Sequence, residues 1–210
     1  MKKIILSALL FVMLISMNVD KAEATTCPTG YVLNTQTVFM NGCSVQVDLC
    51  VKCDPTSPTN DYDLKIMGFG VLNNCNIGLT TPQILSNLNT ICGNPAWLKS
   101  RAICSAGIPD CDQYGAGLGV NIATIICWEK TNVNGNMWYT PCSTTGDIYC
   151  LERFLSCIDP NTGIRQVTRV QGPSLSGQIG NCTTPESQVP DPSTNGQTSA
   201  CFYLNTPCNP

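Results

Sequence analysis

The sequence predicts an α+β, mainly β fold, in which antiparallel hairpins and a meander flank a short helical insertion and disulfides join the elements. Three observations lead to this prediction. Several runs alternate apolar and polar residues with the period of a strand, whereas one stretch has the period of a helix. The chain also has 15 cysteines among its 210 residues, a density that indicates a disulfide scaffold.

The first 24 residues predict a signal peptide. Lys2 and Lys3 precede an apolar run over residues 4–16, and Ala22-Glu23-Ala24 has the small-x-small form that signal peptidases cleave. The apolar run is too short to cross a bilayer comfortably, and no later segment reaches about 18 apolar residues. We therefore expect cleavage after Ala24 and an extracellular or cell-surface protein that is not inserted in a membrane. An uncleaved anchor is the alternative.

The cysteines favour disulfides over metal binding. All 15 of them follow residue 24, and only Cys50 and Cys53 have C-x-x-C spacing, so no second pair completes a four-thiolate site. Residues three apart on a strand point to opposite faces, so we expect Cys50 and Cys53 to join separate bridges rather than form a redox pair. The odd count leaves at least one thiol, which is either buried and inert or bonded to another molecule.

The N-terminal third predicts three strands. Residues 31–40 and 43–53 flank Asn41-Gly42, a dipeptide that favours a type I′ turn because both residues tolerate positive φ. The second of these strands alternates apolar and polar side chains clearly. A third strand is expected over residues 63–72.

The helical insertion covers residues 81–106. Thr81 is the expected N-cap, Pro82 the first helical residue and Gly93 the end of the helix. A second short helix is expected from Asn94-Pro95 to about Ser105.

The chain then returns to strands, expected over 121–131, 137–142, 148–157 and 164–171 and joined by short turns into an antiparallel meander. Residues 25–182 are thus expected to form one disulfide-rich, β-dominated domain. Residues 183–210 form a tail rich in proline, serine and threonine, in which Val189 is the only large apolar residue before Ser199.

Six cysteines are the first candidates for disulfide pairs. A two-residue turn at Asn134-Gly135 places Cys127 opposite Cys142, at a distance that a disulfide accepts if they form a hydrogen-bonded pair. The other two candidate pairs are Cys104–Cys111 and Cys201–Cys208, because each closes a short loop that is polar or contains glycine and proline.

The same hairpin places four side chains, Trp128, Lys130, Met137 and Tyr139, on one face. If that face is exposed, it can stack on a sugar ring or contact a protein. If it is buried, the four side chains are core.

The composition excludes much chemistry. The sequence has no histidine, which excludes Ser-His-Asp and Cys-His hydrolases and HExxH metalloproteases. A glycosidase is the remaining enzymatic alternative. It would need a pair of carboxylates, and no spacing in the sequence selects such a pair. We expect no enzymatic activity, no cofactor and no metal site. The formal net charge is −3 and there is no basic run, which argues against nucleic acid as a partner.

The pattern Cys27-Pro-x-Gly-Tyr31, together with Asn41-Gly42-Cys43 before the C-x-x-C strand, resembles exported cysteine-rich bacterial proteins of unknown function. The resemblance implies no activity. We expect a non-catalytic structural or adhesive protein that associates with itself, and the alternative is a module that binds an extracellular carbohydrate or protein.

Overall fold

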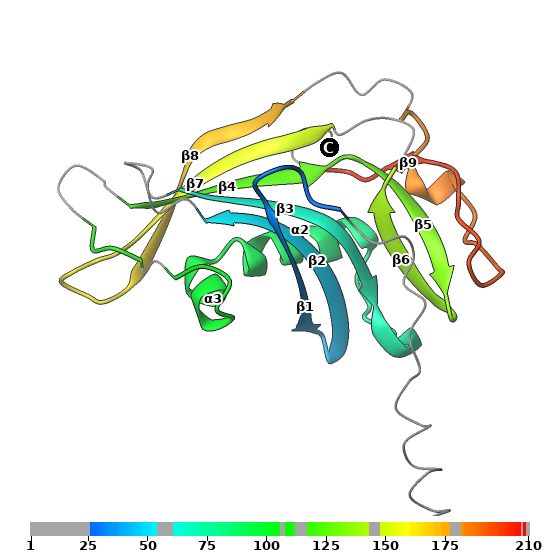
Figure 1. The fold of residues 1–210 in the computed structure, drawn as a ribbon, viewed down its shortest axis with the longest axis horizontal. Helices are drawn as coiled ribbons and strands as arrows, with labels where there is room; N and C mark the ends of the chain where they lie inside the picture. The colour runs from blue at the N-terminus through cyan, green and yellow to red at the C-terminus, as the bar shows by residue number, and fades with distance from the viewer. Residues whose placement is uncertain are drawn as a thin grey trace, which may run out of the picture.

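The computed structural model describes the parts of the chain named here: residues 26–53, 61–105, 108–111, 117–142, 148–176, 182–206 and 208 (Figure 1). The expected signal peptide lies outside the described residues. Within them the protein is mainly β, with nine strands in one mixed sheet, two α-helices and seven disulfides, so the predicted fold class is confirmed.

The elements follow the chain in an order that separates two groups of strands by the helices. Their bounds are β1 Val32–Met40, β2 Cys43–Cys53, β3 Tyr62–Val71, η1 Leu72–Asn74, α2 Thr81–Cys92, α3 Pro95–Ser100, β4 Leu118–Ile125, β5 Cys127–Val133, β6 Asn136–Pro141, β7 Tyr149–Ile158, β8 Arg165–Leu175, η2 Glu186–Gln188 and β9 Phe202–Tyr203.

The predicted N-terminal hairpin is confirmed. β1 and β2 pair without a register shift, and Met40 lies opposite Cys43. Asn41 and Gly42 between them have φ values of 47° and 80°, the left-handed backbone that a type I′ turn requires.

Strand β3 has three neighbours, and this divides the sheet. One edge of β3 pairs with β2 along its length. The other edge pairs in parallel with β4 over Tyr62–Ile66 and then antiparallel with β6 at Phe69 and Gly70. The sheet therefore forks into a β4–β7–β8 branch and a β6–β5–β9 branch, which separate in Figure 1.

The expected meander differs from this arrangement. The hairpins β5–β6 and β7–β8 form with the predicted short turns. However, the strand expected over residues 121–131 is interrupted at Ile126, because the chain passes there from one branch of the fork to the other. β7 consequently pairs with β4 rather than with β6.

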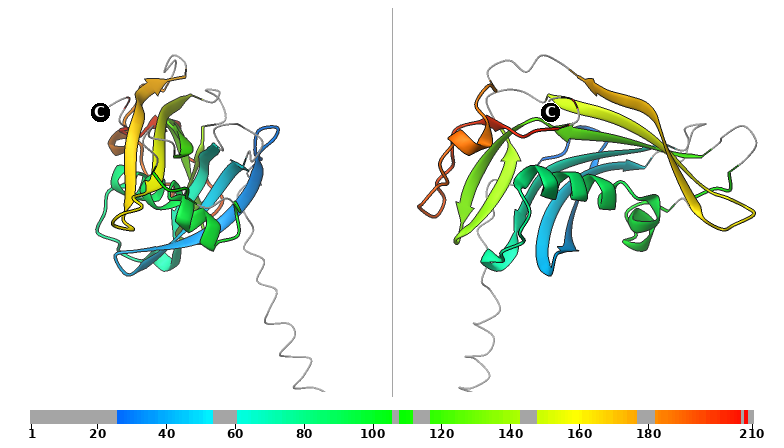
Figure 2. Two further views of the ribbon diagram at one scale, coloured as in Figure 1. Left: turned by 90° about the vertical axis from the view of Figure 1, so that its left-hand side faces the viewer. Right: turned by 180° about the vertical axis from the view of Figure 1, so that it is seen from behind.

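Helix α2 covers one face of the sheet, as Figure 2 shows. Its buried residues are the apolar face that the helical period predicts: Ile84, Leu85, Leu88 and Cys92. The helix starts one residue before the expected position, with Thr80 as N-cap, and the Gln83 side chain accepts a hydrogen bond from the Thr80 backbone N–H at 2.9 Å. Gly93 is the C-cap as predicted, whereas α3 ends at Ser100 rather than near Ser105.

None of the three candidate disulfide pairs forms, although all six cysteines are bridged. Cys127 and Cys142 do lie opposite one another, since the Cys142 N–H donates to the Cys127 carbonyl at 3.0 Å, but Cys127 bonds to Cys182, just before the tail, and Cys142 bonds to Cys201 of the tail. The two short loops expected at Cys104–Cys111 and Cys201–Cys208 do not close either, because each of these cysteines bonds to one far away in the sequence. The bridges are Cys27–Cys50, Cys43–Cys75, Cys53–Cys104, Cys111–Cys157, Cys127–Cys182, Cys142–Cys201 and Cys150–Cys208.

Two predictions about the cysteines are confirmed. Cys50 and Cys53 join separate bridges, to Cys27 and Cys104. Cys92 is the free cysteine and is fully buried at the end of α2. Burial raises the pKa of the Cys92 thiol to about 12, so it stays protonated and unreactive near neutral pH.

We therefore expect native protein at pH 8 to give no rapid reaction with a disulfide-exchange thiol reagent. Unfolding in guanidinium chloride without a reductant exposes Cys92 and should yield one reactive thiol per chain. Stoichiometric labelling of the native protein within seconds would contradict the buried position.

The C-terminal tail is held against the sheet. β9 pairs with β5, and Cys182, just before the tail, bonds to Cys127 of β5. The tail cysteines Cys201 and Cys208 bond to Cys142, which follows β6, and to Cys150 of β7. Phe202 and Leu204 are buried in the same core as α2 and β3. The tail is thus part of the packing of the fold.

Candidate functional site

Trp128 and Lys130 belong to the core, which is one of the two alternatives that the sequence leaves open for this face. Trp128 has 0% and Lys130 has 3% of its surface exposed, because the tail covers them. The Lys130 ammonium donates to the Val189 carbonyl at 2.9 Å and lies 5.5 Å from the Phe202 ring. The Tyr139 ring stacks on Phe69 with centroids 4.8 Å apart. Met137 and Tyr139 are half-buried, and the Tyr139 hydroxyl donates to Glu186 Oε1 at 3.0 Å.

A cleft of about 400 Å³ lies elsewhere, between α2 and the β4–β7–β8 branch. This volume is within the range of small-molecule sites. Leu85 and Asn89 of α2 form one wall, and Thr206 of the tail closes another part. The sheet side is lined mainly by Val120, Ile122, Glu152, Phe154, Arg165 and Arg169.

The strand period brings the sheet-side residues together. Ile122 lies opposite Glu152 on the β4–β7 pair, and Phe154 lies opposite Arg169 on the β7–β8 pair. Directly opposed residues project to the same face, so β7 and β8 contribute alternate residues to the cleft. The sequence predicts neither Glu152 nor the two arginines as cleft residues, because it does not show that β7 and β8 face α2.

The cleft is lined by more positive than negative side chains. The Glu152 carboxylate is only 7% exposed, and its Oε1 lies 2.7 Å from a guanidinium nitrogen of Arg169. The Arg165 Nε donates to Ser156 Oγ at 2.7 Å, and burial lowers the pKa of its guanidinium, which remains charged at neutral pH. Two cations and one anion leave the cleft with a positive excess at the Arg165 end.

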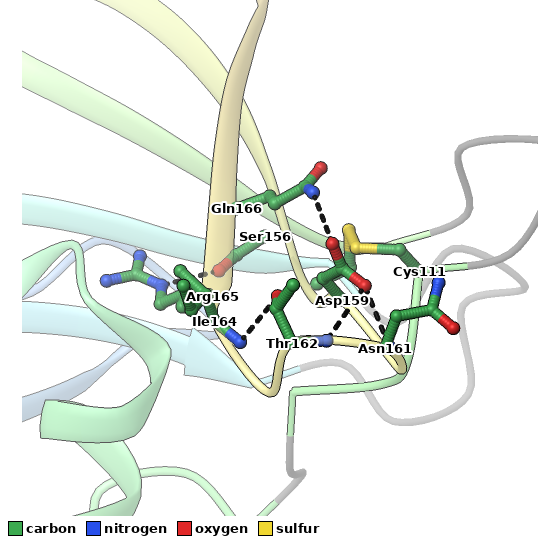
Figure 3. Close-up of a disulfide and its surroundings, with 9 residues drawn as sticks. Cys111, Ser156, Asp159, Asn161, Thr162, Ile164, Arg165 and Gln166 are labelled. Atoms are coloured by element: carbon green, nitrogen blue, oxygen red, sulfur yellow. Dashed lines mark hydrogen bonds between the residues drawn. A yellow bond between two sulfur atoms is a disulfide. The ribbon is translucent and has the colours of Figure 1, made fainter.

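A tight turn positions Arg165 (Figure 3). Asp159 Oδ1 accepts hydrogen bonds from the backbone N–H groups of Asn161 at 2.8 Å and Thr162 at 3.4 Å. These bonds, that of Asn161 most of all, lower the pKa of the exposed Asp159 carboxyl. The Cys111–Cys157 disulfide anchors the strand just before the turn. β8 therefore begins in a fixed register, with Arg165 as its first residue.

Besides Glu152 Oε1, which has only its ion pair with Arg169, two buried polar atoms in the cleft wall have no hydrogen-bond partner among the described residues. They are Thr206 Oγ1, on a residue only 6% exposed, and Asn89 Oδ1, whose amide nitrogen donates to Thr124 Oγ1 at 2.7 Å. Leaving such an atom unpaired costs about 1–3 kcal/mol, so a bound polar molecule that reached it would gain a hydrogen bond. These atoms are the strongest sign of a ligand in the cleft.

The opposite face of the sheet carries polar residues that satisfy one another. The Lys65 ammonium lies 4.9 Å from the Tyr31 ring and 4.4 Å from the Tyr149 ring. Asn121 donates to Asp63 Oδ1 at 2.7 Å. Burial and the neighbouring Asp63 carboxylate raise the pKa of Tyr31. On the same face Arg153 Nε has no hydrogen-bond partner among the described residues, but the Arg153 guanidinium pairs with Asp61 at 3.0 Å, so we interpret this face as structural.

One group has the composition of a metal site but not its chemistry. Donor atoms of Glu129, Cys142 and Cys201 lie within 4.8 Å of one another. The two sulfurs are bonded to each other, however, and a disulfide lacks the thiolates that bind metals.

Comparison of the chain with protein-family models, curated proteins and solved structures found no match. Among the described residues, no helix combines the length and apolar character needed to cross a bilayer. The seven disulfides indicate an oxidising compartment. The class that the fold and the cleft define is a disulfide-stabilised, mainly β protein with a small-molecule-sized cleft.

Proposed function

We propose that this protein is an exported, non-catalytic binding protein that holds an acidic carbohydrate in the cleft between α2 and the β4–β7–β8 branch. The observation that carries the proposal is the pair of unpartnered buried atoms, Thr206 Oγ1 and Asn89 Oδ1, in a cleft that Arg165 also lines. An acidic sugar has the complementary groups. Its carboxylate fits the guanidinium, and its hydroxyls donate to Asn89 and exchange hydrogen bonds with Thr206.

The chemistry of the cleft favours binding over turnover. Glycosidases use two carboxylates, whereas Glu152 is the one acidic side chain among the described residues that line the cleft, and it is paired with Arg169. With no histidine in the chain, a general base that titrates near neutral pH is also lacking. The disulfides and the signal-peptide pattern of residues 1–24 support export.

Binding should be measured by calorimetry, with oligosaccharides of uronic acids and with neutral oligosaccharides of the same length. We expect the acidic set to bind more tightly, and Arg165→Gln to weaken its binding about ten- to hundredfold, the value of a charge-assisted hydrogen bond. Arg101→Gln is the matched control, since that guanidinium lies over the Trp97 ring outside the cleft. Equal affinities for both sets, or equal effects of the two variants, would overturn the proposal.

A second candidate function, a structural or adhesive role through self-association, is favoured by a separate observation. β1 lies at an edge of the sheet, has no charged side chain and exposes apolar side chains. Light scattering over a range of protein concentrations tests this candidate. A chain that stays monomeric at high concentration would contradict it.

A further inference from the structure

Two long strands at the margins of the sheet differ in how they are protected from pairing with other chains. β8 pairs only with β7 among the described residues, and it carries two arginines, a proline and two register shifts. Charges, proline and bulges are the usual means of blocking an edge. β1 pairs only with β2 in the described chain and has none of these features over its nine residues.

The turn at Asn41-Gly42 determines which backbone groups of β1 are free. A two-residue turn is flanked by a hydrogen-bonded pair, here Met40 and Cys43, and such pairs recur at every second residue. The even-numbered residues of β1 therefore bond to β2. The odd-numbered residues direct N–H and C=O groups away from the sheet, and these groups have no backbone partner in the described chain. They are Leu33, Thr35, Thr37 and Phe39.

We propose that β1 pairs with β1 of a second copy of this chain, antiparallel about a two-fold axis at Gln36. This register places odd-numbered residues opposite odd-numbered residues, so the free groups of each strand meet those of the other. Leu33 then lies opposite Phe39 of the second copy, and Thr35 opposite its Thr37. Apolar–aromatic and Thr–Thr pairs are both stabilising across strands, and no like charges meet. The interface is isologous.

Other registers fit less well. A shift by one residue places the free N–H and C=O groups of one strand opposite backbone groups of the other strand that already bond to β2. A register centred on Thr35 places Leu33 opposite Thr37 and separates Leu33 from Phe39. Leu33 is 41% and Phe39 is 75% exposed, and the register centred on Gln36 brings these two apolar side chains together.

The second copy is favoured over an unrelated partner because β1 is complementary to itself in both backbone and side chains. The inference rests on the second candidate function, self-association, and is independent of the cleft. Joining two copies through β1 gives one continuous sheet, in which each copy contributes the outer strands β8 and β9 of its two branches.

The first test changes the charge of the edge. We expect the unmodified protein to sediment as a dimer. Thr37→Lys should raise the dissociation constant of the dimer about tenfold or more, because it places a charged side chain between the paired β1 strands of the two copies. Thr168→Lys on the exposed edge strand β8 is the matched control and should leave the dimer unchanged. A dimer that resists Thr37→Lys, or a monomeric unmodified protein, would overturn the proposal; only the second result also contradicts self-association.

The second test reads the register. Gln36 opposes itself in a non-hydrogen-bonded pair, in which Cα atoms are about 4.5 Å apart, a distance that disulfides accept. Gln36→Cys should therefore give a covalent dimer on mild oxidation. Thr35→Cys, which has no cysteine opposite, should give much less. Equal cross-linking of the two variants would exclude this register, and unchanged unfolding curves would show that both variants fold.

Discussion

Replacing both Cys53 and Cys104 by alanine is expected to lower the free energy of unfolding by about 4 kcal/mol. The bridge joins the end of β2 to the chain after α3 across a sequence separation of 51 residues. Without it, the unfolded chain gains the entropy of a loop of that size. The native chain also loses the covalent link that holds the helical insertion to the sheet. Urea unfolding under oxidising conditions measures the change.

Cys92→Ala is the control for this double variant, because it removes a buried sulfur without removing a bridge. We expect it to cost about 1 kcal/mol, the value for a small loss of core volume. If the double variant lost no more stability than Cys92→Ala, the link between β2 and the α3 region would contribute little to the folded state.

Trp128→Ala is expected to lower the free energy of unfolding by about 3–5 kcal/mol. The Trp128 ring is fully buried, meets the Phe69 ring edge-on with centroids 5.3 Å apart, and donates from Nε1 to the Ile125 carbonyl at 2.9 Å. Alanine leaves a cavity beneath the tail and an unpaired carbonyl.

Trp97→Ala provides the comparison, since Trp97 is only half-buried on the short helix α3 and its ring faces the Arg101 guanidinium at 5.8 Å. Its loss should cost clearly less, measured by the same urea titration. Similar costs for the two substitutions would mean that Trp128 is less enclosed than the structure shows.

Local signals in the sequence were sufficient for the elements whose structure depends on neighbouring residues. The Asn41-Gly42 and Asn134-Gly135 turns occur where the dipeptides predict them, with positive φ at all four residues. The apolar face of α2 and the separation of Cys50 from Cys53 also follow from periodicity alone.

The sequence was insufficient where structure depends on contacts between distant segments. Nothing near Cys127 or Cys142 in the chain indicates that their sulfurs meet Cys182 and Cys201. The burial of Trp128 follows from the tail, whose composition does not show where it packs. The exposure of a strand face is decided by which segment covers it, and alternation does not reveal that segment.

The cleft was not predicted for a related reason. The alternation of Glu152, Phe154 and Ser156 on β7 and of Arg165, Val167 and Arg169 on β8 is visible in the sequence. Their convergence requires knowing that β7 pairs with β4 and that α2 crosses that branch. Only the topology of the sheet supplies this information.

The two edges of β3 make contacts of different sequence separation, so we expect them to form at different rates. β2 precedes β3 closely in the chain, and the Cys43–Cys75 bridge closes within the same segment. The other edge pairs with β4 and β6, which follow the helices, so the entropy of closing a longer loop slows its pairing. The bridges of Cys127, Cys142 and Cys150 span 55, 59 and 58 residues, and we expect them to be among the slowest to close.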